Sequence, residues 1–137
     1  MKAKISWDGE ARFVAETESH HTVLMDGPPE HGGKNSGPRP MEMMLMAIGG
    51  CAAFDVVHIL KKGRQSIVSC DAQVEAVRSD EVPAVFTKIH LHFKVSGGNI
   101  KENIVRNAVK LSAEKYCSAS IMLSKGGVEI THSLELI

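Results

Sequence analysis

The stretch MEMMLMAIGGCAAFDVVHIL, residues 41–60, is the most hydrophobic segment of the chain and the strongest candidate for its core. It follows Pro40, which suits the first turn of a helix, where its missing N–H costs no hydrogen bond. Lys62 is favourable at the C-terminal end of a helix, and Gly63 is a typical stop. The sequence therefore predicts one long helix from about residue 40 to residue 62, with a single thiol, Cys51, near its centre.

This helix has the length of a membrane span, but its composition argues against one. Glu42, Asp55 and His58 lie inside the apolar stretch. An acidic side chain in the middle of a membrane helix costs roughly 3 kcal/mol. The pattern therefore predicts a helix buried in a protein core, and we expect no membrane association.

Alternating strands are expected on both sides of this helix. The pair Asp8-Gly9 between alternating runs is a hairpin signal, and the Gly- and Pro-rich residues 27–40 can only be a loop. The expected elements are strands at 2–7, 11–17 and 21–25, the long helix, strands at 66–79 and 85–97, helices at 99–116 and 118–127, and a strand at 128–137. The strands at 66–79 and 85–97 should pair antiparallel, and Asn99 should cap the helix that follows. This order indicates an α+β fold in a single domain, residues 1–137.

The bulk composition excludes several classes of protein. The 16 basic residues are balanced by 16 acidic ones, and one Trp, one Tyr and four Phe offer little stacking surface, so no nucleic-acid partner is expected. The N-terminal segment MKAKISWDGE lacks the apolar stretch of a secretion signal, and three cysteines are too few for a disulfide scaffold. We therefore expect a cytoplasmic protein with reduced thiols.

The three cysteines have different surroundings in the sequence. Cys70 shares a strand face with Val68 and Ala72, which favours a small buried core residue. Cys51, in GGCAA, and Cys117, in YCSAS, stand beside small residues that let another group approach the sulfur. Either cysteine alone would be taken as an inert buried residue. As a pair in a reducing compartment, however, they could share redox chemistry.

Two motifs carry a resemblance to a known family. PMEMMLMAIGGC, residues 40–51, together with EKYCSAS, residues 114–120, resembles the OsmC/Ohr family of thiol-dependent hydroperoxide reductases, and most closely its small bacterial OsmC-like members. The resemblance implies a two-layer α+β fold in which antiparallel sheets wrap around two central helices. It also implies an intertwined homodimer with active sites at the dimer interface, where Cys51 is the peroxidatic thiol and Cys117 the resolving thiol.

The family also places an arginine beside the peroxidatic thiol and a carboxylate that orients this arginine. The candidates here are Arg39, slightly favoured over Arg12, and Glu42 as the carboxylate. Glu42 stands one residue later than the family glutamate, a rotation of about 100° on a helix. The reductases also carry Cys-Pro at the second cysteine, where this chain has Cys117 followed by Ser118.

The leading functional hypothesis is a cysteine-based peroxidase that reduces organic hydroperoxides and is recycled by an external dithiol. The alternatives are a non-catalytic protein that binds a small hydrophobic ligand in the same cleft, and a thiol- or sulfur-transfer protein. No cofactor and no metal are expected, because His90 and His92, although spaced as a ligand pair, lack an obvious third ligand and fit a solvated strand face.

Overall fold

The computed structural model describes residues 1–137 and forms two compact units, Met1–Met44 and Leu45–Ile137. The order of elements, three strands, a helix, two strands, two helices and a final strand, confirms the order expected from the sequence. Two short additional turns occur, a 3₁₀ turn η1 (Pro29–His31) and a π-helical turn η2 (Ser112–Tyr116). The α+β class is thus confirmed, whereas the single-domain organisation stays a prediction.

The first unit contains a three-stranded antiparallel sheet. Strands β1 (Ala3–Trp7), β2 (Phe13–Thr17) and β3 (Thr22–Met25) pair in sequence order. The predicted Asp8-Gly9 turn joins the first two strands, and Gly9 has the positive φ of 84° that such a turn favours. Local turn chemistry therefore accounts for this sheet.

The Gly- and Pro-rich loop after β3 is organised around one buried carboxylate. Asp26 is 2% exposed and accepts hydrogen bonds from the backbone N–H groups of Gly27, Lys34 and Ser36 at 2.8, 3.0 and 3.0 Å. The Ser36 hydroxyl donates a fourth at 2.6 Å. These bonds, the Ser36 hydroxyl first among them, hold the pKa of Asp26 well below its ordinary value. The carboxylate therefore fixes the path of a loop whose regular structure is limited to the short turn η1.

We expect Asp26→Asn to lower the Tm at neutral pH by several degrees, because an amide cannot accept all four bonds as an anion does. The folded-state pKa is depressed, so the stabilisation is fully present above the ordinary pKa of 3.8 and is lost as the pH falls below it. The difference in Tm between wild type and variant should therefore shrink between about pH 5 and pH 2. The exposed Asp80→Asn serves as the matched control, and equal Tm values for wild type and Asp26→Asn at neutral pH would contradict the role of this carboxylate.

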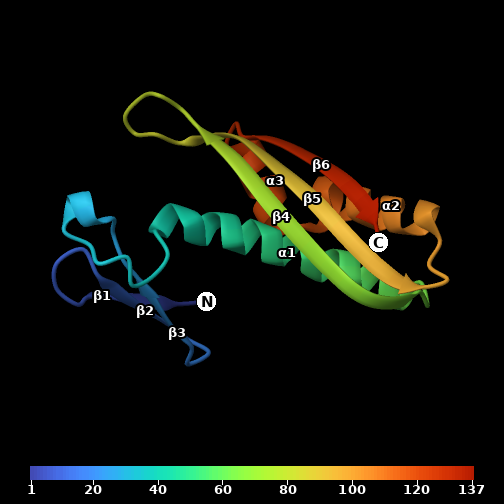
Figure 1. Ribbon diagram of the computed structural model, residues 1–137, viewed down its shortest axis with the longest axis horizontal. Coiled ribbons are helices and arrows are strands. Elements are labelled where there is room, and N and C mark those ends of the chain that lie inside the picture. The colour runs from blue at the N-terminus through green and yellow to red at the C-terminus, as the bar shows by residue number, and fades with distance from the viewer. The chain divides into compact units, whose positions relative to one another are not determined.

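The second unit is built on a sheet of three strands in the order β4-β5-β6 (Figure 1). Strands β4 (Ser66–Arg78) and β5 (Phe86–Gly98) pair antiparallel, as expected. Strand β6 (Glu129–Leu136) pairs with β5 in parallel, so the expectation of purely antiparallel sheets is wrong for this edge. The parallel direction follows from the helices between β5 and β6, which form a crossover connection rather than a hairpin.

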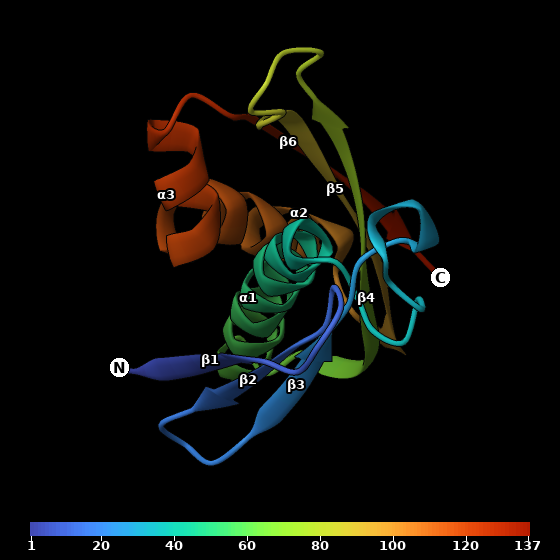
Figure 2. The same ribbon diagram turned by 90° about the vertical axis from the view of Figure 1, so that its left-hand side faces the viewer.

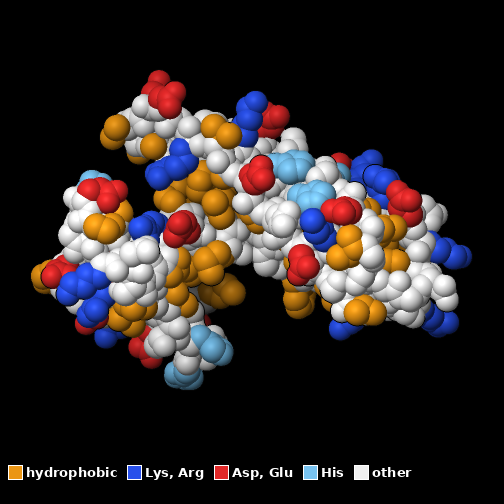
Figure 3. All heavy atoms as spheres, in the orientation of Figure 1, with side chains coloured by type: hydrophobic (Ala, Val, Ile, Leu, Met, Phe, Trp, Pro, Cys, Tyr) orange, Lys and Arg blue, Asp and Glu red, His pale blue; other side chains and the backbone are white.

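Three helices cover one face of this sheet (Figure 2). They are α1 (Pro40–Lys62), α2 (Glu102–Leu111) and α3 (Ser118–Lys125). The inward residues of β5 form the centre of the core, and Leu91, Phe93 and Val95 are all completely buried. The opposite face carries histidines among acidic and basic side chains (Figure 3). Alternation along β5 therefore separates core from surface as period-two patterning predicts.

Two local details differ from the sequence prediction. Val68 was expected on the buried face of β4 with Cys70, but it is 81% exposed. A register irregularity between Ile67 and Ser69 turns its side chain outward, since one extra residue in a strand reverses the alternation. Asn99 does not cap α2 either, because it has a positive φ of 56° and the N-cap position is Lys101.

Helix α1 begins and ends where the sequence predicts, but one chain does not bury it all round. Only one stripe is fully buried, and it contains Ile48, Gly49, Ala52, Val56 and Leu60. Gly49 approaches β4 so closely that an added Cβ would lie 2.8 Å from a Val74 methyl group. Phe54, on the other side, is 72% exposed. The predicted core helix is therefore a helix with one buried and one open apolar face.

Helix α1 is also the one helix long and apolar enough to cross a membrane. Its most apolar 18-residue stretch has a mean hydropathy of 1.9, and 28% of that stretch is buried. Core helices of water-soluble proteins meet the same criterion, so length and composition alone are weak grounds for a span. The close contact of Gly49 with Val74 shows that this helix packs against the sheet.

Candidate functional site

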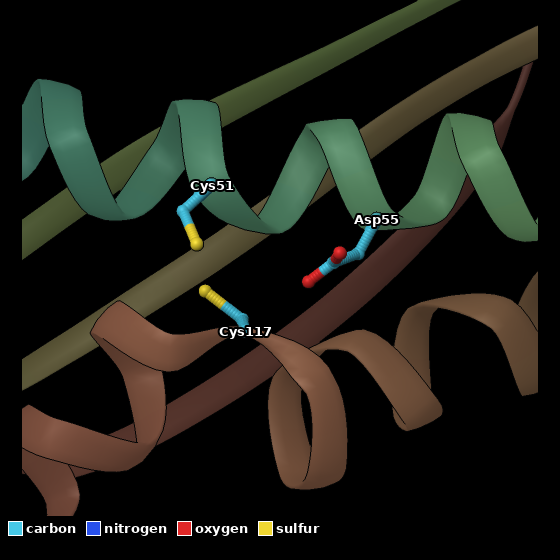
Figure 4. Close-up of side chains that lie close together, drawn as sticks. All are labelled: Cys51, Asp55 and Cys117. Atoms are coloured by element: carbon cyan, nitrogen blue, oxygen red, sulfur yellow. The ribbon is translucent and has the colours of Figure 1, made fainter.

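Cys51 and Cys117, far apart in the sequence, meet at one point of the second unit. The Sγ atoms of Cys51 and Cys117 and a carboxylate oxygen of Asp55 all lie within 4.8 Å of one another. The close-up shows the two sulfurs facing each other, with the Asp55 carboxylate directed toward the same space (Figure 4). Both thiols are free, and Cys51 is half-buried whereas Cys117 is fully buried. The structure thus brings together the two cysteines that the sequence singled out.

Cys117 is held in place by an irregular turn. The π-helical turn η2 ends α2, and the Cys117 backbone then adopts an extended conformation with ψ of 106° before α3 begins. As the N-cap of α3, its Sγ accepts a hydrogen bond from the backbone N–H of Ser120 at 3.4 Å. The N-terminus of a helix stabilises negative charge, so this position opposes the effect of burial on the Cys117 thiol.

Ser112 ties this turn to the helix that carries Cys51. Its buried hydroxyl donates to the carbonyl oxygen of Ala52, the residue after Cys51, at 2.9 Å. Its own carbonyl accepts from the Cys117 N–H at 2.8 Å. One residue therefore bonds both to the residue after Cys51 and to the backbone of Cys117, and links the two segments that carry the sulfurs.

We expect Ser112→Ala to lower the free energy of unfolding by about 1 kcal/mol, because it removes a buried hydrogen bond between two elements. Urea denaturation followed by circular dichroism measures this change. Ser118→Ala, at an exposed position of the same segment, should leave the midpoint unchanged. Identical midpoints for Ser112→Ala and wild type would show that the contact with Ala52 does not hold the site together.

Burial shifts the protonation of two groups in the site. Burial raises the pKa of Cys117, while the hydroxyl and backbone N–H of Ser120 oppose this shift and the nearby Cys51 adds to it. Burial likewise raises the pKa of Asp55, with a smaller opposing effect of His58. Both groups therefore favour their neutral forms more than they would in water.

Comparisons with known proteins identify the family of this chain. The model of one protein family, described as OsmC-like protein, matches residues 33–133 of the chain. The chain belongs to the OsmC-like family. This OsmC-like protein is also 49% identical over 140 residues to Protein YhfA of Escherichia coli K12, a match that covers 100% of this chain and 98% of that protein.

Solved structures give the same fold. A hypothetical protein from Aquifex aeolicus VF5 is 28% identical, with a TM-score of 0.81 over 99% of this chain and 96% of that one. A Legionella pneumophila protein described as organic hydroperoxide resistance protein OsmC, predicted redox protein, is 18% identical, with a TM-score of 0.74 over 98% of this chain and 95% of that one. At this low identity, the second likeness supports the fold alone.

The other predicted site residues of this OsmC-like protein lie in the first unit. The Arg39 guanidinium donates to the Asn35 side chain at 2.6 Å, while the Glu42 carboxylate accepts the Arg39 backbone N–H at 2.8 Å. Glu42 thus caps the start of α1 rather than binding the guanidinium. The alternative, Arg12, pairs with Asp8 at 2.7 Å. Which guanidinium accompanies Cys51 stays a prediction.

Asp55, Ser112 and Ser120 are site residues that the sequence analysis did not assign. The signal for Asp55 was its position one turn after Cys51, since residues four apart share a helix face. Ser112 and Ser120 gave no such signal, because their roles depend on the turn between α2 and α3.

Other residues singled out in the sequence lie outside the site. Cys70 is half-buried rather than a core residue. His58 is exposed and stacks on Phe54, with ring centroids 6.3 Å apart. His90 and His92 are half-buried and both bond to the Ser133 hydroxyl, at 2.8 and 2.7 Å.

Proposed function

We propose that this protein reduces organic hydroperoxides with Cys51 and Cys117 as a redox pair, in a role related to the peroxide stress response. The single observation that carries the proposal is the meeting of two free thiols within 4.8 Å, each contributed by one of the two family motifs. Membership of the OsmC-like family supports the same chemistry.

Cys51 is the attacking thiol in this proposal, because it is the more accessible of the two. Its thiolate attacks one peroxide oxygen, the O–O bond breaks, and the sulfur becomes a sulfenic acid. The departing alkoxide takes up one proton and leaves as an alcohol. Asp55, whose burial favours the protonated form, lies close enough to Cys51 to supply that proton.

Cys117 is the resolving thiol. Its sulfur attacks the sulfenic sulfur of Cys51, a disulfide forms, and the hydroxyl leaves as water. A disulfide needs about 2.05 Å between its sulfurs, so both side chains must move closer than they are in the reduced protein. An external dithiol then exchanges with the disulfide, returns two thiols and is itself oxidised to a disulfide.

Activation of Cys51 needs a positive charge. A thiolate in the middle of a helix needs a nearby cation, and Arg39 is the proposed source, with Arg12 as the alternative.

We also propose a homodimer in which the open apolar face of α1, with Met46 at 60% and Phe54 at 72% exposure, packs against a second copy. This arrangement would bury the side of α1 that one chain leaves open.

Stopped-flow measurement of cumene hydroperoxide consumption by the reduced protein tests the activity. We expect a fast phase that consumes one equivalent of peroxide per chain, followed by turnover when a dithiol is supplied. Consumption no faster than that by free thiols in buffer would contradict the proposed function. Binding of an unreacted apolar compound, or a persistent Cys51 adduct with a sulfur donor, would favour one of the two alternative functions instead.

A further inference from the structure

The carboxylate of Asp55 is the part of the cysteine site that a thiol pair alone does not require. Its Oδ2 atom is buried and has no hydrogen-bond partner. A carboxylate oxygen of Asp55 lies beside the Cys51 and Cys117 sulfurs, with the three donor atoms within 4.8 Å of one another (Figure 4). A buried carboxylate oxygen without a partner is costly, and a proton or a cation removes that cost.

We propose that this site binds one Zn²⁺ ion through the sulfurs of Cys51 and Cys117 and the carboxylate of Asp55, with the fourth position open. Zinc takes thiolate and carboxylate ligands at about 2.3 and 2.0–2.2 Å, so the donors of a tetrahedral site lie about 3.5–3.8 Å apart. The three donors are therefore at most about 1.3 Å farther apart than zinc requires. Small rotations of the three side chains would bring the donor atoms to the separation that zinc requires.

The surroundings of Cys117 suit a metal-bound thiolate. The backbone N–H of Ser120 already donates to its sulfur at 3.4 Å. The hydroxyl of Ser120 is buried near that sulfur and can also donate to it. Such donors outside the ligand shell orient metal-bound ligands and support their charge.

The mixed donor set selects the metal. Copper(I) favours sulfur ligands alone, and magnesium or calcium favours oxygen ligands alone. Two thiolates with one carboxylate suit zinc, which accepts both donor types.

The zinc site does not depend on the peroxide chemistry proposed above, although both use the same sulfurs. Zinc and hydroperoxide should therefore compete for the thiol pair.

Titration of the reduced, metal-free full chain with Zn²⁺ against a chromophoric chelator tests the site. We expect one zinc per chain for wild type and for the control Cys70→Ser. Cys51→Ser should weaken binding by about 100-fold or more, and Asp55→Asn by about 10-fold or more, because each removes a ligand. Cobalt(II) in place of zinc should give a thiolate-to-metal charge-transfer band in wild type that is lost in Cys51→Ser.

Three results would overturn the proposal. They are wild-type affinity in Asp55→Asn, wild-type affinity in Cys51→Ser, and loss of binding in Cys70→Ser. Circular dichroism of each variant confirms that it is folded. Zinc binding without peroxide reduction would refute the proposed function alone, and peroxide reduction without zinc binding would refute the zinc site alone.

Discussion

Replacing Cys51 by serine should lower the rate of organic hydroperoxide consumption by about 10³-fold or more, because a serine hydroxyl is not ionised near neutral pH and the attacking thiolate is lost. The substitution exchanges one small side chain for another at a half-buried position, so the fold should remain intact. The rate is measured by stopped flow with the reduced, metal-free protein.

The remaining cysteines supply the controls for this prediction. Cys70→Ser should react as fast as wild type, since Cys70 lies outside the site. Cys117→Ser should retain the first step but stop at the sulfenic acid on Cys51, which dimedone traps and mass spectrometry detects. Equal rates for wild type and Cys51→Ser would remove the basis for a peroxidase. A fast reaction in Cys51→Ser that is lost in Cys117→Ser would reverse the roles of the two thiols.

Replacing Phe54 by glutamate should convert the proposed homodimer to a monomer. Phe54 is 72% exposed on the open face of α1, and an added Cβ at the neighbouring Gly50 would contact nothing within 4 Å. A carboxylate placed in a desolvated apolar interface costs several kcal/mol, which weakens association by about 100-fold or more. Sedimentation velocity should then give the mass of one 14.8 kDa chain.

The matched control for the interface is Val77→Glu. Val77 is also an exposed apolar residue, at 56% exposure, but it lies on strand β4 rather than on α1. This variant should remain dimeric. A wild-type protein that sediments as a monomer, or a Phe54→Glu variant that stays dimeric, would contradict packing of two copies through α1.

Helix α1 shows how much of the fold local sequence can determine. Its bounds agree with the prediction because Pro40 favours a first turn and Gly63 a stop, both through backbone chemistry that acts within a few residues. The direction of β6 could not be predicted in the same way. Period-two alternation reveals which face of a strand is buried, but the same alternation fits a parallel or an antiparallel neighbour.

In the candidate site, too, some residues could be predicted from local sequence and others only from tertiary packing. The two motifs around Cys51 and Cys117 were enough to expect a shared site, and the structure brings these sulfurs together. The spacing of Asp55 from Cys51 placed it on the same helix face, but only the packing of the segment around Cys117 makes its carboxylate part of the site. Ser112 could not be recognised, because its hydrogen bond to Ala52 joins segments far apart in the chain.

Peptide mapping by mass spectrometry after one equivalent of cumene hydroperoxide tests the redox pair most directly. The reduced, metal-free protein should yield a Cys51–Cys117 disulfide within one chain, with Cys70 still a free thiol. The site would not be a redox pair if Cys117 remained a free thiol while Cys51 was oxidised beyond the sulfenic acid, or if the disulfide formed with Cys70 instead.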